Sequence, residues 1–183
     1  MKILTVNNKK EEKFLRRRTA DFDFSAYSAA AGKESAKKEL NELIGKMRET
    51  MIAANGIGLS ANQIGLGLRL FVAQISKEPL KRDEKNKIIM PPSDKAEFYA
   101  IFNPEIIKFS KEKTTMEEGC LSVPRVYGLV DRPASVVLAG QNETGKQIEI
   151  KARGLMARVF QHETDHLNGI LFTDKARDIH KIE

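Results

Sequence analysis

Two of the three histidines lie four residues apart in the segment HETDH, residues 162–166. On a helix, positions i and i+4 project from the same face, with Cβ atoms roughly 5–6 Å apart. Two imidazoles at such positions can bind one ion at ~2.0–2.1 Å each. Glu163 is rotated by roughly 100° from His162. Its carboxylate can therefore accept a proton from a water molecule whose pKa the ion lowers. The pattern predicts a metal-dependent hydrolase with ligands His162 and His166 and general base Glu163, and the alternative is a polar stripe on an ordinary helix.

Apolar neighbours favour the metal site over the polar stripe. Val159, Phe160 and Leu167 surround the two histidines and indicate a helix inside the domain. Buried imidazoles need polar partners, and a metal ion supplies one.

The third ligand must come from elsewhere in the chain. A metzincin carries a further histidine where this chain has Phe172, and a thermolysin-like enzyme takes a glutamate well downstream, where only Glu183 remains. The only cysteine, Cys120, lies upstream in MEEGCLSVP. A lone cysteine is most often a small buried apolar residue. One cysteine and two histidines with an open position, however, form a catalytic ligand set.

Two segments are expected to be helices. Residues 34–54 carry apolar side chains at spacings of three and four, and the pair Asn55-Gly56 should end this helix because glycine tolerates the left-handed conformation. Residues 155–167 contain the HETDH segment and end at another Asn-Gly pair.

Strands are expected at residues 68–75, 98–107, 135–140 and 147–152, with the last two joined by a hairpin turn at 142–145. Connections this short favour antiparallel pairing. The predicted fold is α+β, with antiparallel β-sheets packed around the late helix that carries HExDH and an amphipathic helix near the N-terminus.

The whole chain, residues 1–183, is expected to form a single catalytic domain, with residues 77–97 as an exposed insertion. A hydrophobic content of 41% and a charged content of 31% are typical of a folded globular protein. No apolar run approaches the ~20 residues of a membrane span. The N-terminus becomes polar too soon for a secretory signal, and one cysteine forms no internal disulfide. These features predict a cytoplasmic protein, or the mature form of an organellar one, with no membrane partner.

The net charge of +6 comes partly from basic runs such as Arg16-Arg17-Arg18. No zinc-finger, RRM or KH signature accompanies the charge, so no specific nucleic-acid motif is predicted. The charge predicts a solvated basic surface, and a weak attraction to a polyanion such as ribosomal RNA stays open.

Three separated motifs resemble those of the peptide deformylase family, in the same order. GIGLSANQ at 56–63 is similar to the family's GxGxAAxQ, with Ser60 in place of the first alanine. EGCLS at 118–122 and HETDH at 162–166 match fully. The resemblance covers about residues 10 to 175. It implies hydrolysis of the N-formyl group of formyl-methionine on newly made polypeptides, with release of formate.

The resemblance also implies roles for particular residues. Cys120, His162 and His166 would hold one divalent ion per chain, natively Fe²⁺, with Zn²⁺, Ni²⁺ or Co²⁺ as other suitable ions. Glu163 would be the general base. The Gln63 side-chain amide and the backbone N–H of Leu121 would stabilise the oxyanion.

Substrate contacts are expected at Ile57, Gly58, Leu155 and Tyr127. The glycines of GIG would let a peptide backbone approach and pair with Ile57 and Gly58 in strand fashion. Tyr127 stands where some members of the family have a substrate-facing arginine. A second expectation from the family pattern is an ion pair between Arg132 and Asp165.

Two alternatives remain at this point. One is a metallo-amidase or peptidase that cleaves another acyl group or a peptide bond, and the other is a non-catalytic metal-binding homologue at the ribosome. The expected partner is a formyl-methionyl nascent peptide, with transient ribosome contact, and the expected state is a monomer.

Overall fold

The computed structural model describes residues 1–76, 81–82, 84, 88–89 and 96–182. Its α-helices are α1 (Lys9–Leu15), α2 (Phe24–Ala31), α3 (Lys33–Ala53) and α4 (Gly154–Leu167), and short 3-10 turns cover Ala61–Ile64 and Phe172–Asp174. Its strands are β1 (Gly58–Ser60), β2 (Leu70–Ser76), β3 (Lys81–Arg82), β4 (Ile88–Ile89), β5 (Ala96–Phe109), β6 (Lys113–Cys120), β7 (Val123–Pro133), β8 (Ser135–Gln141), β9 (Gln147–Arg153) and β10 (Arg177–Lys181). No helix in this described part is long and apolar enough to cross a membrane.

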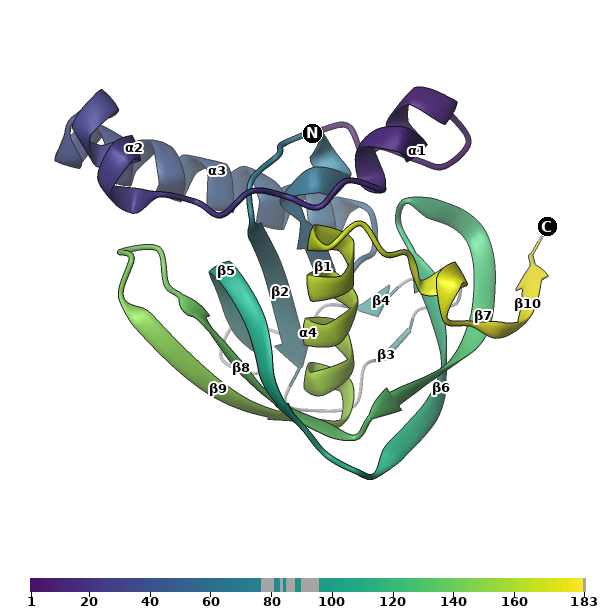
Figure 1. The fold of residues 1–183 in the computed structure, drawn as a ribbon. Coiled ribbons are helices and arrows are strands. Elements are labelled where there is room, and N and C mark those ends of the chain that lie inside the picture. The colour runs from purple at the N-terminus through teal and green to yellow at the C-terminus, as the bar shows by residue number, and fades with distance from the viewer. Residues whose placement is uncertain (77–80, 83, 85–87, 90–95, 183) are drawn as a thin grey trace.

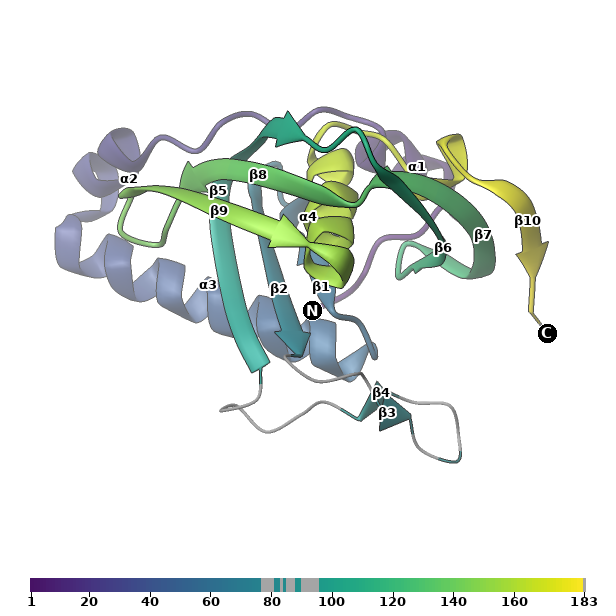
Figure 2. The same ribbon diagram turned by 90° about the horizontal axis from the view of Figure 1, so that it is seen from below.

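Two antiparallel sheets enclose α4. The larger sheet has the strand order β1-β2-β5-β8-β9, and the smaller has the order β10-β7-β6. Figure 1 shows α4 between the two sheets, and Figure 2 shows α3 along the outside of the larger sheet. The α+β class with antiparallel sheets around the late helix is confirmed.

The side-chain alternation of β2 explains why a helix covers each face of the larger sheet. Leu70 and Val72 pack into one apolar cluster with α3, whereas Phe71, Ala73 and Ile75 pack into the other with α4. Successive strand residues point to opposite faces, so this fully buried strand separates the two clusters. The second cluster holds α4 against the sheet and so fixes the position of the polar residues of this helix.

The two predicted helices are confirmed, with a correction at the end of the first. Asn55, not Gly56, takes the left-handed conformation, with φ of 61°. Gly56 lies close to Leu121: a Cβ at position 56 would be 2.8 Å from Leu121 Cδ1, the end of a flexible side chain. At the end of α4, Gly169 has φ of 77°, as the glycine stop predicts.

The predicted strands are also confirmed, and β8 pairs with β9 across the turn at 142–145. The proposed insertion at 77–97 lies mostly outside the described residues, apart from the short pair β3 and β4. The hairpin of β6 and β7, which carries Cys120, was not anticipated from the sequence pattern.

Candidate metal centre

Three side chains from two distant segments converge beside α4. Cys120 ends β6, and His162 and His166 lie one helical turn apart on α4. Their potential ligand atoms all lie within 4.8 Å of one another, and Cys120 Sγ is 3.1 Å from His166 Nε2. The structure therefore brings together the three residues that the sequence picked out as ligands.

The protonation of Cys120 suits a metal ligand. Partial burial by itself would raise the pKa of the thiol, but the neighbouring imidazoles of His166 and His162 lower it to about 5. The thiolate is the form that binds divalent transition metals. Ser122 contributes a backbone N–H at 3.4 Å from the sulfur, which further favours the charged form.

His162 is oriented by Glu118, a residue that the sequence analysis did not single out. Glu118 Oε2 accepts a hydrogen bond from His162 Nδ1 at 3.0 Å, which leaves Nε2 to face the cluster. The carboxylate also accepts from Arg132 Nε at 2.6 Å and from Arg158 Nη1 at 2.5 Å. Burial would raise the pKa of Glu118, but the hydrogen bonds from His162 and Arg132 hold it well below its ordinary value. A carboxylate behind a ligating histidine fixes its tautomer and ring orientation.

The expected pairing of Arg132 with Asp165 is present, at 2.7 Å between Nη1 and Oδ2. Arg132 thus joins Asp165 on α4 to Glu118 on β6, and so it links the two segments that supply the three side chains.

Glu163 lies next to the cluster and is 3% exposed. Its Oε2 is buried, with no hydrogen-bond partner among the residues that the structure describes. Burial raises the pKa of this carboxyl above its ordinary value of 4.5, although the two histidines act in the opposite direction. An unsatisfied, buried acceptor beside a Cys-His-His cluster fits a site built for an ion and a water molecule.

Gln63 is held so that its amide nitrogen faces Cys120. Gln63 Oε1 accepts hydrogen bonds from the backbone N–H and the hydroxyl of Ser60, both at 2.9 Å. Gln63 Nε2 consequently lies 3.7 Å from Cys120 Sγ and 3.2 Å from Ser122 Oγ. The hydroxyl of Ser60, at the position of the family's alanine, shares its one proton between Gln63 Oε1 and Asn62 Oδ1, which lies 2.8 Å away.

The close approach of Glu163, and not only that of a substrate peptide, leaves no room for a side chain at position 58. A Cβ on Gly58 would lie 2.3 Å from Glu163 Oε1 and 3.0 Å from Val159 Cγ1. Gly58 belongs to β1, which is an edge strand of its sheet and, among the residues that the structure describes, pairs with β2 alone. The open edge of β1 and the carboxylate of Glu163 thus lie side by side.

The remaining expected substrate residues lie in two places. Ile57 and Leu155 pack against the same apolar cluster as α4. Tyr127 lies opposite Gly119 in the β6–β7 ladder, and its ring fills the space that a Cβ on Gly119 would need. The same ring stacks on His180, with centroids 6.1 Å apart. Leu121 directly follows Cys120 in the tight turn between β6 and β7.

Replacing Gly58 with alanine tests whether the space beside the Glu163 carboxylate must stay empty. The added methyl group must displace the Glu163 carboxylate, and a misplacement of about 1 Å can lower activity about 10²-fold. Gly56→Ala is the matched control, because its Cβ would lie 2.8 Å from the movable end of Leu121 and 3.4 Å or more from its other neighbours. We expect kcat/KM to fall much further in Gly58→Ala than in Gly56→Ala, and equal losses would contradict the role given to Gly58.

Comparison with known proteins agrees with this geometry. The sequence model of the family described as polypeptide deformylase matches residues 3–181. A peptide deformylase of Chloroflexus aurantiacus is 41% identical over 143 residues, which cover 78% of this chain and 74% of the relative.

Solved structures show the same similarity. A probable peptide deformylase from Synechococcus phage S-SSM7 is 36% identical, with a TM-score of 0.72 over 96% of this chain and 99% of its own. A class I type b peptide deformylase from Acinetobacter baumannii, solved with Met-Ala-Ser bound, is 28% identical, with a TM-score of 0.76 over 96% of this chain and 97% of its own.

Proposed function

The chain belongs to the polypeptide deformylase family, and from this premise we propose how its residues remove the N-formyl group from the formyl-methionine of newly made polypeptides. The observation that carries the proposal is the group of three ligand atoms within 4.8 Å, set beside the buried carboxylate of Glu163.

The residues fit a divalent ion. A thiolate and two imidazoles form a ligand set with room for a further position, which is typical of catalytic rather than structural sites. Cys120, His162 and His166 would hold the ion, which when bound polarises the formyl carbonyl and lowers the pKa of the attacking water. We propose Fe²⁺ as the native ion, as the resemblance to the family implies. Zn²⁺, Ni²⁺ and Co²⁺ would be functional substitutes, because all four ions accept nitrogen and sulfur ligands.

Glu163 would transfer the proton. Its unpartnered Oε2 accepts a proton from the attacking water as the oxygen of that water bonds to the formyl carbon. Glu163 then delivers this proton to the amide nitrogen as the C–N bond breaks, and formate leaves. A raised pKa suits both halves of this step, since the base must also be a competent acid.

Gln63 and Leu121 would stabilise the negative charge that develops on the formyl oxygen. Donors oriented in advance toward that position are worth most in a site that excludes water. The two hydrogen bonds from Ser60 provide this orientation for Gln63.

The open edge of β1 would receive the peptide. Ile57 and Gly58 would pair with the substrate backbone as an added strand, and Ile57 with Leu155 would line the pocket for the methionine side chain. Tyr127 would contact later substrate residues. The Met-Ala-Ser complex of the Acinetobacter relative supports a peptide ligand of this kind. Two side chains that differ by one methylene group or one sulfur atom differ in binding free energy by only ~1–3 kcal/mol in an apolar pocket. The enzyme would therefore prefer methionine without excluding similar side chains.

The decisive assay measures formate release under anaerobic conditions from formyl-Met-Ala-Ser and, in parallel, acyl release from its N-acetyl analogue. We expect rapid hydrolysis of the formyl peptide and little of the acetyl peptide. Equal rates would favour a broader metallo-amidase, and no turnover by metal-loaded protein would favour a silent metal-binding homologue.

Cys120→Ala tests the ligand set directly. Loss of one of three ligands should reduce bound metal, measured by elemental analysis after dialysis, from about one ion per chain to a small fraction of that. His180→Ala is the matched control, because this third histidine is exposed in β10. Retained stoichiometry in Cys120→Ala would remove Cys120 from the proposed ligands.

We also infer one catalytic domain over the whole chain, a monomer in solution, cytoplasmic location and transient contact with the ribosome. Packing of α4 against strands of both sheets supports the single domain. The single free cysteine supports a reducing compartment. Sedimentation at about the chain mass of 20.6 kDa tests the monomer, and co-sedimentation with ribosomes at several salt concentrations tests the contact.

A further inference from the structure

A cavity lies against α4 on a different face of this helix from His162 and His166. Its volume is about 620 Å³, which is within the range of small-molecule sites. The residues of α4 that line it recur at spacings of three and four, and they are Gln161, Thr164, Asp165 and Asn168. This spacing defines one helix face. His162 and His166 each follow a lining residue by one position and are therefore rotated by roughly 100° away from the cavity.

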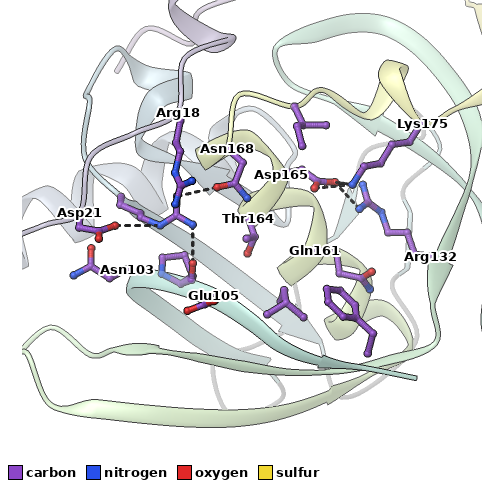
Figure 3. A pocket seen from close by; sticks show the side chains of 15 residues that line it. Arg18, Asp21, Asn103, Glu105, Arg132, Gln161, Thr164, Asp165, Asn168 and Lys175 are labelled. Atoms are coloured by element: carbon purple, nitrogen blue, oxygen red, sulfur yellow. Dashed lines mark hydrogen bonds and ion pairs between the residues drawn. The ribbon is translucent and has the colours of Figure 1, made fainter. Parts of the chain in front are cut away.

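Thr164 lines this cavity and has an unused hydroxyl. Its residue is 7% exposed, and its Oγ1 is buried with no hydrogen-bond partner in the part of the chain that the structure describes. Figure 3 shows Thr164 between Gln161 and Asn168, among the other lining side chains. A buried hydroxyl without a partner is unfavourable, so this group is available to a ligand.

Two arginines line the cavity next to this helix face. Arg69 is 6% exposed, and its guanidinium donates to Asn168 Oδ1 and to the Pro104 carbonyl, both at 3.0 Å. The carboxylate nearest to it, Asp21, lies 3.6 Å away and is 78% exposed. Arg18 has no hydrogen-bond or ion-pair partner among the described residues. Burial, followed by the charge of Arg18, lowers the pKa of Arg69, which means that the two cations repel each other.

The cationic side chains around the cavity differ in how closely carboxylates pair with them. Four cationic side chains and three carboxylates line it, which leaves an excess of one positive charge. Arg132 and Lys175 are both bound to Asp165 at 2.7 Å, and Arg132 is also bound to Glu118 at 2.6 Å, so these two cations have two carboxylate partners. Figure 3 shows the two contacts with Asp165 on the other side of Thr164 from Arg18. Arg18 and Arg69 face the carboxylates of Asp21 and Glu105 in equal number. Both of these carboxylates are exposed, however, whereas Arg69 is buried and Arg18 has no ion-pair partner in the described part of the chain.

We propose that this cavity is a binding site for a small organic anion that carries a carboxylate or phosphate group. The anionic group lies between Arg18 and Arg69 and accepts a hydrogen bond from Thr164 Oγ1. The apolar part of the ligand packs against Ile106 and Phe109, which also line the cavity, and Phe109 is 61% exposed. Binding at this site is separate from the deformylation proposed above.

Calorimetric titration of the metal-loaded protein tests the site, with phenyl phosphate, benzoate and inorganic phosphate as probes. We expect one of the two aromatic anions to bind at least about fivefold more tightly than inorganic phosphate, and the better of the two identifies the anionic group. Arg18→Gln and Thr164→Val should each weaken that binding about tenfold or more. Arg17→Gln, which removes the same charge from the neighbouring exposed position, should leave it unchanged.

Three results would overturn the proposal. The first is no saturable binding of any probe at millimolar concentration. The second is binding that Arg18→Gln and Thr164→Val leave intact, which would place the anion at the metal centre instead. The third is an equal loss in Arg17→Gln, which would indicate diffuse attraction to a basic surface. Thermal unfolding of each variant shows whether it is folded, and formate release by Arg18→Gln should equal that of the parent protein.

Discussion

Glu163→Gln should lower kcat by about 10²–10⁴-fold while the protein still binds about one metal ion per chain. Glutamine has the same shape as glutamate, so it fits the space beside Gly58 without a new clash. It cannot accept the proton of the attacking water, and the later protonation of the amide nitrogen is lost with it. The ligands Cys120, His162 and His166 are unchanged, which separates loss of chemistry from loss of metal.

The control and the pH profile make this prediction specific. Glu149→Gln removes an exposed carboxylate on β9 and should leave kcat unchanged. In the parent enzyme, kcat/KM should fall with decreasing pH through a pKa above 4.5, because burial raises the pKa of Glu163 and only its ionised form is the base. That acidic limb should be absent from the residual activity of Glu163→Gln. Full activity in this variant would show that Glu163 is not the base.

The periodic parts of the fold were predictable from sequence. Both α3 and α4 carry apolar residues at helical spacing, and β8 and β9 flank a turn rich in Asn, Thr and Gly. In α3 and β8 one face is buried and the other is not, and β9 alternates between exposed and less exposed residues, which produces the pattern. The helix α4 is buried on nearly every side. The strand β6 gave no such pattern, because its first five residues are all exposed and do not alternate. The helix α2 buries none of its residues, so its position also had no sequence signal.

The site was predictable only in part, because local spacing identifies residues on one element but not residues that the fold brings together. HETDH identifies two ligands by local spacing, whereas Cys120 is joined to them only through the antiparallel pairing of β6 and β7 and the packing of α4. The family motif EGCLS contains Glu118, and this was the available signal for its importance. Its role depends on Arg132 of β7 and on Arg158 and His162 of α4. Helical spacing joins Arg158 to His162, but no spacing rule could have joined this pair to Glu118 and Arg132.

Glu118→Gln should destabilise the protein by about 3–5 kcal/mol, because it leaves Arg132 and Arg158 buried without their shared carboxylate. Because the pKa of Glu118 is lowered in the folded protein, its contribution is present above the ordinary value of 4.5 and is lost as the pH falls below it. Loss of the carboxylate that orients His162 should also weaken metal binding by about 10–100-fold. Denaturant unfolding of the metal-free protein measures the first effect, and competition with a chelator measures the second.

The neighbouring Glu117→Gln isolates these effects. Glu117 is 54% exposed and lies 3.6 Å from the exposed His180. Its substitution should change stability by less than about 0.5 kcal/mol and leave metal affinity unchanged. If Glu118→Gln behaved like Glu117→Gln, the network would be incidental to the fold, and His162 would be oriented by the ion alone. If it lost stability but kept its metal affinity, Glu118 would hold β6 and β7 against α4 without acting on the ligand.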